Sequence, residues 1–143
     1  MPKRFHFQIV TREGVRYDGQ VTSVRMRAHD GYFGVLADHA PLIAALQAGE
    51  LVLTPEGQRL PLYFAAGPGV ADIHENEVVA LVETAERAEE IDLARAQAAA
   101  ERARARLAGE QQAEVNTERA VAALERALVR LHLAERLDTH SPT

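Results

Sequence analysis

The chain has 143 residues, of which 47% are hydrophobic and 26% charged, as is typical of a soluble folded protein of one or two domains. Its formal net charge of −5 argues against a general nucleic-acid or anionic-membrane binder. The sequence has no cysteine, which excludes disulfides and cysteine-based metal sites.

The N-terminal residues contain neither a long apolar stretch nor a small-residue cleavage site, so we expect no signal peptide. No window approaches the roughly 18 apolar residues of a membrane helix, so we expect no direct membrane insertion. Eight of the nine glycines and all seven aromatic residues precede residue 70, and alanine dominates after Thr84. This change in composition predicts two domains, at residues 1–85 and 86–143.

Short β-strands are predicted for the first domain. Phe5, Phe7 and Ile9 recur with the period of two that a half-buried strand requires. Further apolar runs lie at 15–17, 21–26, 33–36, 51–53, 60–64 and 78–82. Turn signals separate them at 13–14, 18–19, 30–31, 56–57, 67–69 and 75–76. Many short strands without intervening helices predict an antiparallel β-sandwich or flattened barrel and argue against a parallel sheet.

An antiparallel two-helix hairpin is predicted for the second domain, which places the whole chain in the α+β class. We expect helices at about 90–107 and 115–137, followed by a short disordered tail. Glu89, Glu90 and Asp92 supply the negative charge that a helix N-terminus favours. Gly109 occupies the position of a C-cap for the first helix.

Each predicted helix carries one packing stripe and one arginine stripe. The packing stripes are Leu93, Ala96, Ala100, Ala103 and Leu107 on the first helix, and Val121, Leu124, Leu128 and Leu131 on the second. On the second helix the arginines Arg119, Arg126 and Arg130 lie nearly opposite this stripe. Because alanine buries little area, we expect helices that form readily but dock weakly, as suits a movable element.

Catalytic machinery is not predicted. Ser23 and Ser141 are the only serines, and neither lies in a nucleophile-elbow motif. The pairs His29–Asp30 and Asp38–His39 lie beside turn signals, which favours a structural role over a metal or acid–base site. We therefore predict no catalytic and no metal-binding residue.

Asp92 and Arg95, three residues apart, admit two interpretations. They could form a surface ion pair that contributes a few tenths of a kcal/mol. Alternatively, arginines from both helices could converge on a polyphosphate or on an acidic patch of a partner protein. Neighbouring glutamates could neutralise the arginines instead, so the residues alone leave the choice open.

Several motifs together resemble the epsilon subunit of bacterial F-type ATP synthase. The most specific is GYFGVLADHAPL at 31–42, which is similar to the family pattern G-x-x-G-[IV]-L-x-x-H-A-P-L. LQAG at 46–49 matches L-x-x-G, and IDLARA at 91–96 is similar to [IL]-D-x-x-R-A. The chain departs from the family at 66–70, where many members carry Gly-Gly followed by a large apolar residue.

The resemblance implies a β-sandwich followed by a helical hairpin, and a non-catalytic rotor subunit of the central stalk. Such a subunit couples proton translocation to ATP synthesis and inhibits ATP hydrolysis through its mobile hairpin. The implied partners are the gamma subunit, the c-ring and, in the inhibitory state, the alpha/beta catalytic head, with no nucleic acid. The implied location is the cytoplasmic face of the bacterial plasma membrane, as a peripheral protein.

No cofactor is required by the resemblance, but regulatory ATP is implied. Its binding residues, carried over by motif, are Ile91, Asp92, Arg95, Ala96, Arg126 and Arg130, with Glu86, Arg102 and Arg119 as weaker matches. Tyr32 and His39 are the implied partner-contact residues. Two alternatives are a free-standing ATP-sensing module and a coiled-coil adaptor, of which only the first binds ATP.

Overall fold

The computed structural model describes residues 2–110 and 117–140. Of the predicted disordered tail, residues 138–140 belong to the second helix, and residues 141–143 lie outside the described residues. The chain divides into two compact units, the first ending at Arg87 and the second beginning at Ala88. Neither helix in the described part of the chain is both long and apolar enough to cross a membrane.

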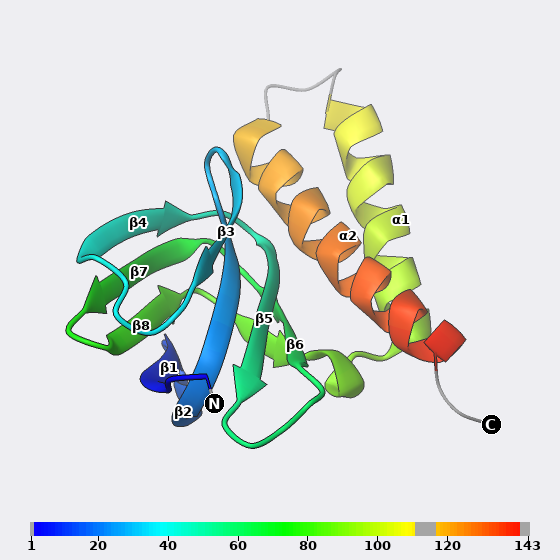
Figure 1. The fold of residues 1–143 in the computed structure, drawn as a ribbon. Coiled ribbons are helices and arrows are strands. Elements are labelled where there is room, and N and C mark those ends of the chain that lie inside the picture. Colours follow the sequence, from blue (N-terminus) through cyan, green and yellow to red (C-terminus); the bar gives the residue numbers. More distant parts are fainter. Residues whose placement is uncertain (1, 111–116, 141–143) are drawn as a thin grey trace. The chain divides into compact units, whose positions relative to one another are not determined.

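Nine β-strands build the first unit (Figure 1). They are β1 (Phe5–Thr11), β2 (Gly14–Ala28), β3 (Gly31–Val35), β4 (Leu42–Leu46), β5 (Gly49–Pro55), β6 (Leu62–Ala66), β7 (Gly69–His74), β8 (Glu77–Val82) and β9 (Ala85–Arg87). The predicted β-sandwich is confirmed.

The long strand β2 joins the two layers. Its first part pairs with β1, and its second part pairs with β3 and β5. The strand order is β1-β8-β7-β4-β2-β5-β6-β9, and the additional pairing of β1 with β2 closes a ring of strands. All pairs between the described strands are antiparallel except β1 with β8, which is a parallel pair within the predicted antiparallel sandwich.

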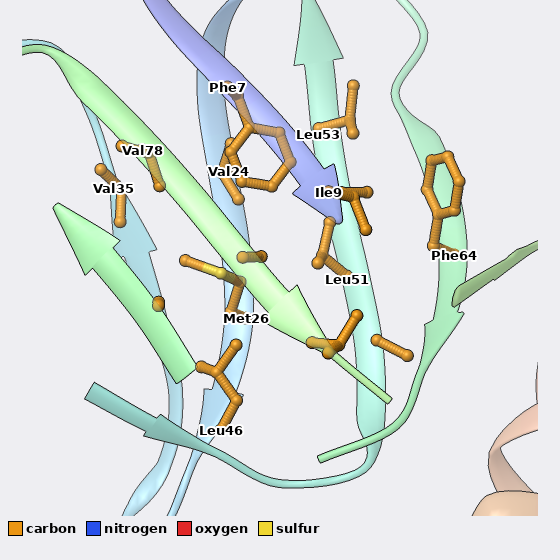
Figure 2. Close-up of a cluster of buried hydrophobic side chains, with 14 of the residues drawn as sticks. Phe7, Ile9, Val24, Met26, Val35, Leu46, Leu51, Leu53, Phe64 and Val78 are labelled. Carbon is orange, nitrogen blue, oxygen red and sulfur yellow. The ribbon is translucent and has the colours of Figure 1, made fainter. Parts of the chain in front are cut away.

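Side chains from both layers form the core of the sandwich (Figure 2). Phe7 and Ile9 of β1 are fully buried, as the period of two predicts, and they meet Leu51 and Leu53 of β5 and Phe64 of β6. Burying each such side chain stabilises the fold by about 1.5–3 kcal/mol. Core burial therefore dominates the stability of this unit.

Three strands, β4, β7 and β9, were not predicted from the sequence. One predicted turn is absent from the described chain. Strand β4 (Leu42–Leu46) has no alternation of polar and apolar residues, β7 begins at a glycine, and β9 has only three residues, so none of them carries a clear strand signal. At Asp18–Gly19 the chain continues straight through β2, because these residues pair with Gln8 and Phe7 of β1. A turn dipeptide has only a local preference, which the partner strand overrides here.

The second unit contains two helices that lie antiparallel and side by side (Figure 1). A 3₁₀ turn at Ala88–Glu90 precedes α1 (Leu93–Glu110), and α2 spans Thr117–His140. Helix α1 runs through Gly109 to Glu110, so Gly109 is not the C-cap that the sequence predicted. A single glycine in a helix costs only about 1 kcal/mol relative to alanine and does not by itself end the helix.

The packing face is as predicted on α1 and different on α2. Ala96, Ala100 and Ala103 of α1 are buried. On α2 the buried residues are Ala127, Leu133 and Ala134, whereas the predicted stripe residues Val121 and Leu128 are 41% and 36% exposed. On both helices most of the buried residues are alanines. The strongest apolar stripe therefore does not mark the packed face.

His6 joins three strands on the surface of the sandwich. Its Nε2 lies 2.5 Å from Oδ1 of Asp18 in β2, and its Nδ1 lies 2.6 Å from Oε2 of Glu77 in β8. Carboxylates only accept hydrogen bonds, so both ring nitrogens donate only when the imidazole is charged. The hydrogen bonds that the ring donates to Asp18 and, with a smaller effect, to Glu77 raise the pKa of His6 above 6.5. The charged ring thus connects β1 to both of its neighbours.

Substitution of His6 by Gln tests this connection. A raised folded-state pKa stabilises the fold fully below about pH 6.5, and this contribution is lost as the pH rises through the folded-state value. His6→Gln should lower the melting temperature by a few degrees near pH 6, and the deficit should shrink at alkaline pH. Thermal unfolding of both proteins across the pH series measures it. His74→Gln is the control, since Nε2 of that ring lies 3.8 Å from Oε1 of its sequence neighbour Glu75. An equal pH-dependent deficit in both variants contradicts the role of His6.

Candidate functional site

The start of α1 is organised by Asp92. Its Oδ1 accepts a hydrogen bond from the backbone N–H of Arg95 at 3.0 Å, and its carbonyl accepts from the N–H of Ala96 at 2.9 Å. These contacts make Asp92 the N-cap of α1, which begins at Leu93. Among the described residues no ion pair joins the Asp92 carboxylate to the Arg95 guanidinium. The spacing of three residues therefore serves a cap rather than the predicted surface ion pair.

Ile91 and Ala96 are packing residues in this unit. Ile91 is 9% exposed and Ala96 fully buried, and the N–H of Ile91 donates to the carbonyl of Ala88 at 3.2 Å. Their side chains hold the first turn of α1 in place. Asp92 and Arg95, by contrast, are exposed. Within the IDLARA motif, the side chains of Ile91 and Ala96 thus anchor the helix start, while those of Asp92 and Arg95 lie at the surface.

Arginines of both helices converge on a hollow of about 430 Å³. Its five lining residues are Arg95, Ala98, Ala99 and Arg102 of α1 and Arg130 of α2. Arg95 and Arg102 are two helical turns apart and share a face, while the alanines between them leave open space. Three guanidinium groups gather around one hollow, and planar guanidinium forks bind phosphate or carboxylate in a bidentate manner.

The volume of this hollow lies within the roughly 300–1,000 Å³ usual for small-molecule sites. Two other hollows lie on the sandwich. One of about 570 Å³ is lined by residues of β2, β3, β5 and β6 together with Leu36 and Pro61 and has Arg25 as its one cation, and one of about 440 Å³ sets Arg12 against Glu83. Neither concentrates a single sign of charge. Of these three hollows, the arginine hollow is therefore the best candidate site for a charged ligand.

The structure places Arg95 and Arg130, and the weaker match Arg102, around one hollow. Arg102, a weak match by motif, lines the hollow beside Arg95. Arg126 lies one turn before Arg130 on α2, is half-buried and does not line the hollow. Glu86 belongs to β9 of the other unit, where it pairs with Ala65. The side chain of Arg119 lies outside the described residues. Arg95 and Arg102 are seven residues apart, and this spacing already indicated from the sequence that they share one face of the helix.

The predicted partner residues lie at different points of one segment. Tyr32 in β3 is 47% exposed; its ring lies 5.0 Å from the guanidinium carbon of Arg25, and its Oη accepts from the N–H of Glu50 at 3.1 Å. His39 lies beyond the end of β3, with its Nδ1 2.6 Å from the carbonyl of Ala40. At this distance Nδ1 carries the proton and donates it. Both side chains are thus held in defined positions at the surface.

Comparison with known proteins covers nearly the whole chain. Residues 4–88 match the family model described as ATP synthase, Delta/Epsilon chain, beta-sandwich domain, and residues 89–135 match the corresponding long alpha-helix domain. A Lawsonia intracellularis protein named ATP synthase epsilon chain is 39% identical over 107 residues, covering 75% of this chain and 79% of that relative. A Desulforudis audaxviator protein of the same name is 44% identical over 102 residues, covering 71% and 73%.

Two solved assemblies contain chains of the same fold. A chain of the Euglena gracilis mitochondrial ATP synthase OSCP/F1/c-ring structure superimposes with a TM-score of 0.69 at 23% identity, covering 97% of this chain and 82% of that chain. A chain of the Tetrahymena thermophila mitochondrial ATP synthase central stalk and c-ring gives 0.57 at 11% identity, covering 94% and 96%. These likenesses support the fold.

The capping role of Asp92 predicts a difference between two substitutions. Asp92→Ala removes the side-chain acceptor and should destabilise the hairpin by about 1 kcal/mol, whereas Asp92→Asn keeps an acceptor and should stay near the wild type. Amide exchange at Arg95 and thermal unfolding followed by circular dichroism measure both effects. Equal stability of the two variants would show that the carboxylate does not act as a cap.

Proposed function

Because this chain belongs to the delta/epsilon chain family of ATP synthase, we propose that it is a non-catalytic subunit of the central rotor stalk. The observation that carries the proposal is that two family models follow one another without a gap, from residue 4 to residue 135. A free-standing sensor or a coiled-coil adaptor would need only the helical part. The match of the sandwich favours the stalk subunit over both alternatives.

The sandwich provides the docking part of the subunit, with the gamma subunit and the c-ring as partners. Large apolar side chains are exposed around the segment that carries the family signature: Leu36 is 66% exposed, Leu42 42% and Ile43 74%. Exposed apolar groups gathered in one segment mark a protein-binding surface. Tyr32 and His39 lie in the same segment and supply polar contacts. Through these contacts the subunit takes part in coupling proton translocation to ATP synthesis. It is then a peripheral protein at the cytoplasmic face of the bacterial plasma membrane.

The hairpin provides the regulatory part and inhibits ATP hydrolysis when it contacts the alpha/beta catalytic head. Its packed face consists mainly of alanine, which buries little area per residue. A hairpin that gains little from its own packing exchanges between conformations at a modest free-energy difference. This property suits an inhibitory arm that engages and withdraws.

Regulatory ATP binds the arginine hollow and favours the closed hairpin in this proposal. Arg95, Arg102 and Arg130 offer donors from both helices to one polyphosphate, so the ligand links the two helices. A ligand at 100 times its Kd stabilises the binding-competent state by about 2.7 kcal/mol. The lining of arginine and alanine contains no general base or nucleophile, which favours binding without hydrolysis. Glu86 and Arg126 remain predictions from the family motif.

The ATP site is tested by removing one cation from each helix. Arg95→Ala and Arg130→Ala should each weaken ATP binding by roughly 10- to 100-fold, since a hydrogen bond to a charged group contributes about 1.5–3 kcal/mol. Isothermal titration calorimetry gives the affinities. Arg104→Ala is the matched control, because Arg104 lies on α1 but pairs with Glu101 at 3.1 Å and does not line the hollow. Unchanged affinity in the first two variants, or the same loss in all three, refutes the site.

The regulatory role is tested by removing the second unit. The truncation ends after Arg87, because β9 (Ala85–Arg87) pairs with β6 and belongs to the sandwich. Full-length protein added to a catalytic head that contains gamma but lacks epsilon should inhibit ATP hydrolysis at least severalfold, and the truncated protein should bind without inhibiting. Steady-state ATPase assays with a parallel binding measurement decide the matter. Inhibition by the truncated protein would remove the role assigned to the hairpin.

A further inference from the structure

Two residues in the left-handed backbone region meet at one end of the sandwich. Asp38, with φ of 64°, lies in the loop between β3 and β4 (residues 36–41). Asn76, with φ of 59°, lies with Glu75 in the two-residue turn that joins β7 to β8. Aspartate and asparagine tolerate this region better than most residues, because their short polar side chains bond locally. Here each side chain is directed at the other loop.

The two side chains form a reciprocal pair. The backbone N–H of Asp38 donates to Oδ1 of Asn76 at 2.6 Å, and Nδ2 of Asn76 donates to Oδ1 of Asp38 at 3.0 Å. The side-chain amide of Asn76 thus accepts one hydrogen bond from Asp38 and donates another to it. Two parallel bonds fix both the distance and the orientation of the loop, which a single bond does not achieve.

Further contacts connect this pair to β1. Nζ of Lys3, the only lysine of the chain, lies 3.0 Å from Oδ2 of Asp38, and the carbonyl of Asn76 accepts from the N–H of His6 at 3.0 Å. Hydrogen bonding from Asn76, and then from Lys3, holds the pKa of the Asp38 carboxyl below its usual value. The β3–β4 loop is therefore anchored to the β7–β8 turn and to the start of the chain.

The anchored loop carries the residues proposed to contact the rotor. His39 follows Asp38 directly, and the exposed side chains of Leu36 and Leu42 lie on either side of it. A loop of six residues between two strands loses conformational freedom when it binds a partner, and a loop that is already ordered loses less. Asp38 and Asn76 themselves need not touch the partner to affect its binding.

We propose that the reciprocal Asp38–Asn76 pair is a positioning device that presets the β3–β4 loop for docking onto the rotor. The inference rests on the proposed function, in which this loop meets the gamma subunit or the c-ring. Binding to the rotor then depends on the hydrogen bonds between residues 38 and 76, and not on which residue type stands at each of the two positions. The pairing requires one amide and at most one carboxylate.

Exchanging the aspartate and the asparagine between positions 38 and 76 distinguishes positioning of the loop from direct contact with the partner. Asn76→Asp sets two carboxylates against each other and breaks one of the two bonds. In the double variant Asp38→Asn/Asn76→Asp the carboxylate accepts from the N–H of residue 38 and from the new amide, so both bonds return. Both residue types tolerate the left-handed backbone at either position. Glu75→Gly is the matched control, because Glu75 shares the turn and its positive φ of 47° but has no part in the pair.

Binding of the full-length variants to an immobilised complex of gamma and c-ring, purified without this subunit, gives the rates of association and dissociation. Asn76→Asp should weaken binding by about fivefold to tenfold, and the double variant should restore it to within about twofold of the wild type. Glu75→Gly should bind as the wild type does. Amide exchange over residues 36–41 should become faster in Asn76→Asp and return to normal in the double variant. A purely structural role would lower the melting temperature without this local change.

The outcomes separate the inference from the function on which it rests. No binding by the wild-type protein overturns the proposed stalk role. Wild-type binding with an equally strong Asn76→Asp variant, or loss of binding that the double variant does not restore, overturns the positioning role alone. If Asn76→Asp does not fold, Asn76→Gly removes the pairing while it keeps a left-handed turn, and unchanged affinity and loop exchange in that variant overturn the inference equally.

Discussion

The close packing of an alanine face against a second helix governs the chemistry of the C-terminal unit. Ala96, Ala100 and Ala103 of α1 are small and buried, and α2 packs beside this helix. Arg95, Arg102 and Arg130 then surround one hollow. The same small side chains limit the apolar area that stabilises the hairpin. In the proposed function, an anion site completed by both helices and a weakly packed hairpin both follow from this use of alanine, and a bound anion would strengthen the association of the two helices.

The sandwich follows the opposite principle. Its core contains large side chains such as Phe7, Leu53 and Phe64, and the long strand β2 links both layers. Closure through β1, β2 and β8 leaves few free strand edges, which protects the unit against nonspecific pairing. Such a frame holds surface loops at fixed positions, as a docking unit requires. The charged His6 between Asp18 and Glu77, and the pair of Asp38 with Asn76, add polar links at the surface of that frame.

At several positions the structure shows a different role for a residue from the one that the sequence suggested. Asp92 and Arg95 suggested an ion pair, but the carboxylate caps the helix, because an unpaired backbone N–H is available at every helix start. Val121 and Leu128 suggested the buried stripe of α2, but the alanines of α1 select a different face. Asp38 was assigned a structural role by its turn context, yet its partner Asn76 lies 38 positions away and could not be found from local pattern.

The sequence by itself determined the α+β class, the β-sandwich followed by a hairpin, and the family, because these depend on local periodicity, composition and motifs. Tertiary structure alone decided the parallel pairing of β1 with β8, the continuity of β2, the face on which α2 packs, and which arginines share the hollow. Each of these depends on contacts between residues far apart in the chain. Such contacts are settled by shape and by the pairing of backbone groups, and local preferences yield to them.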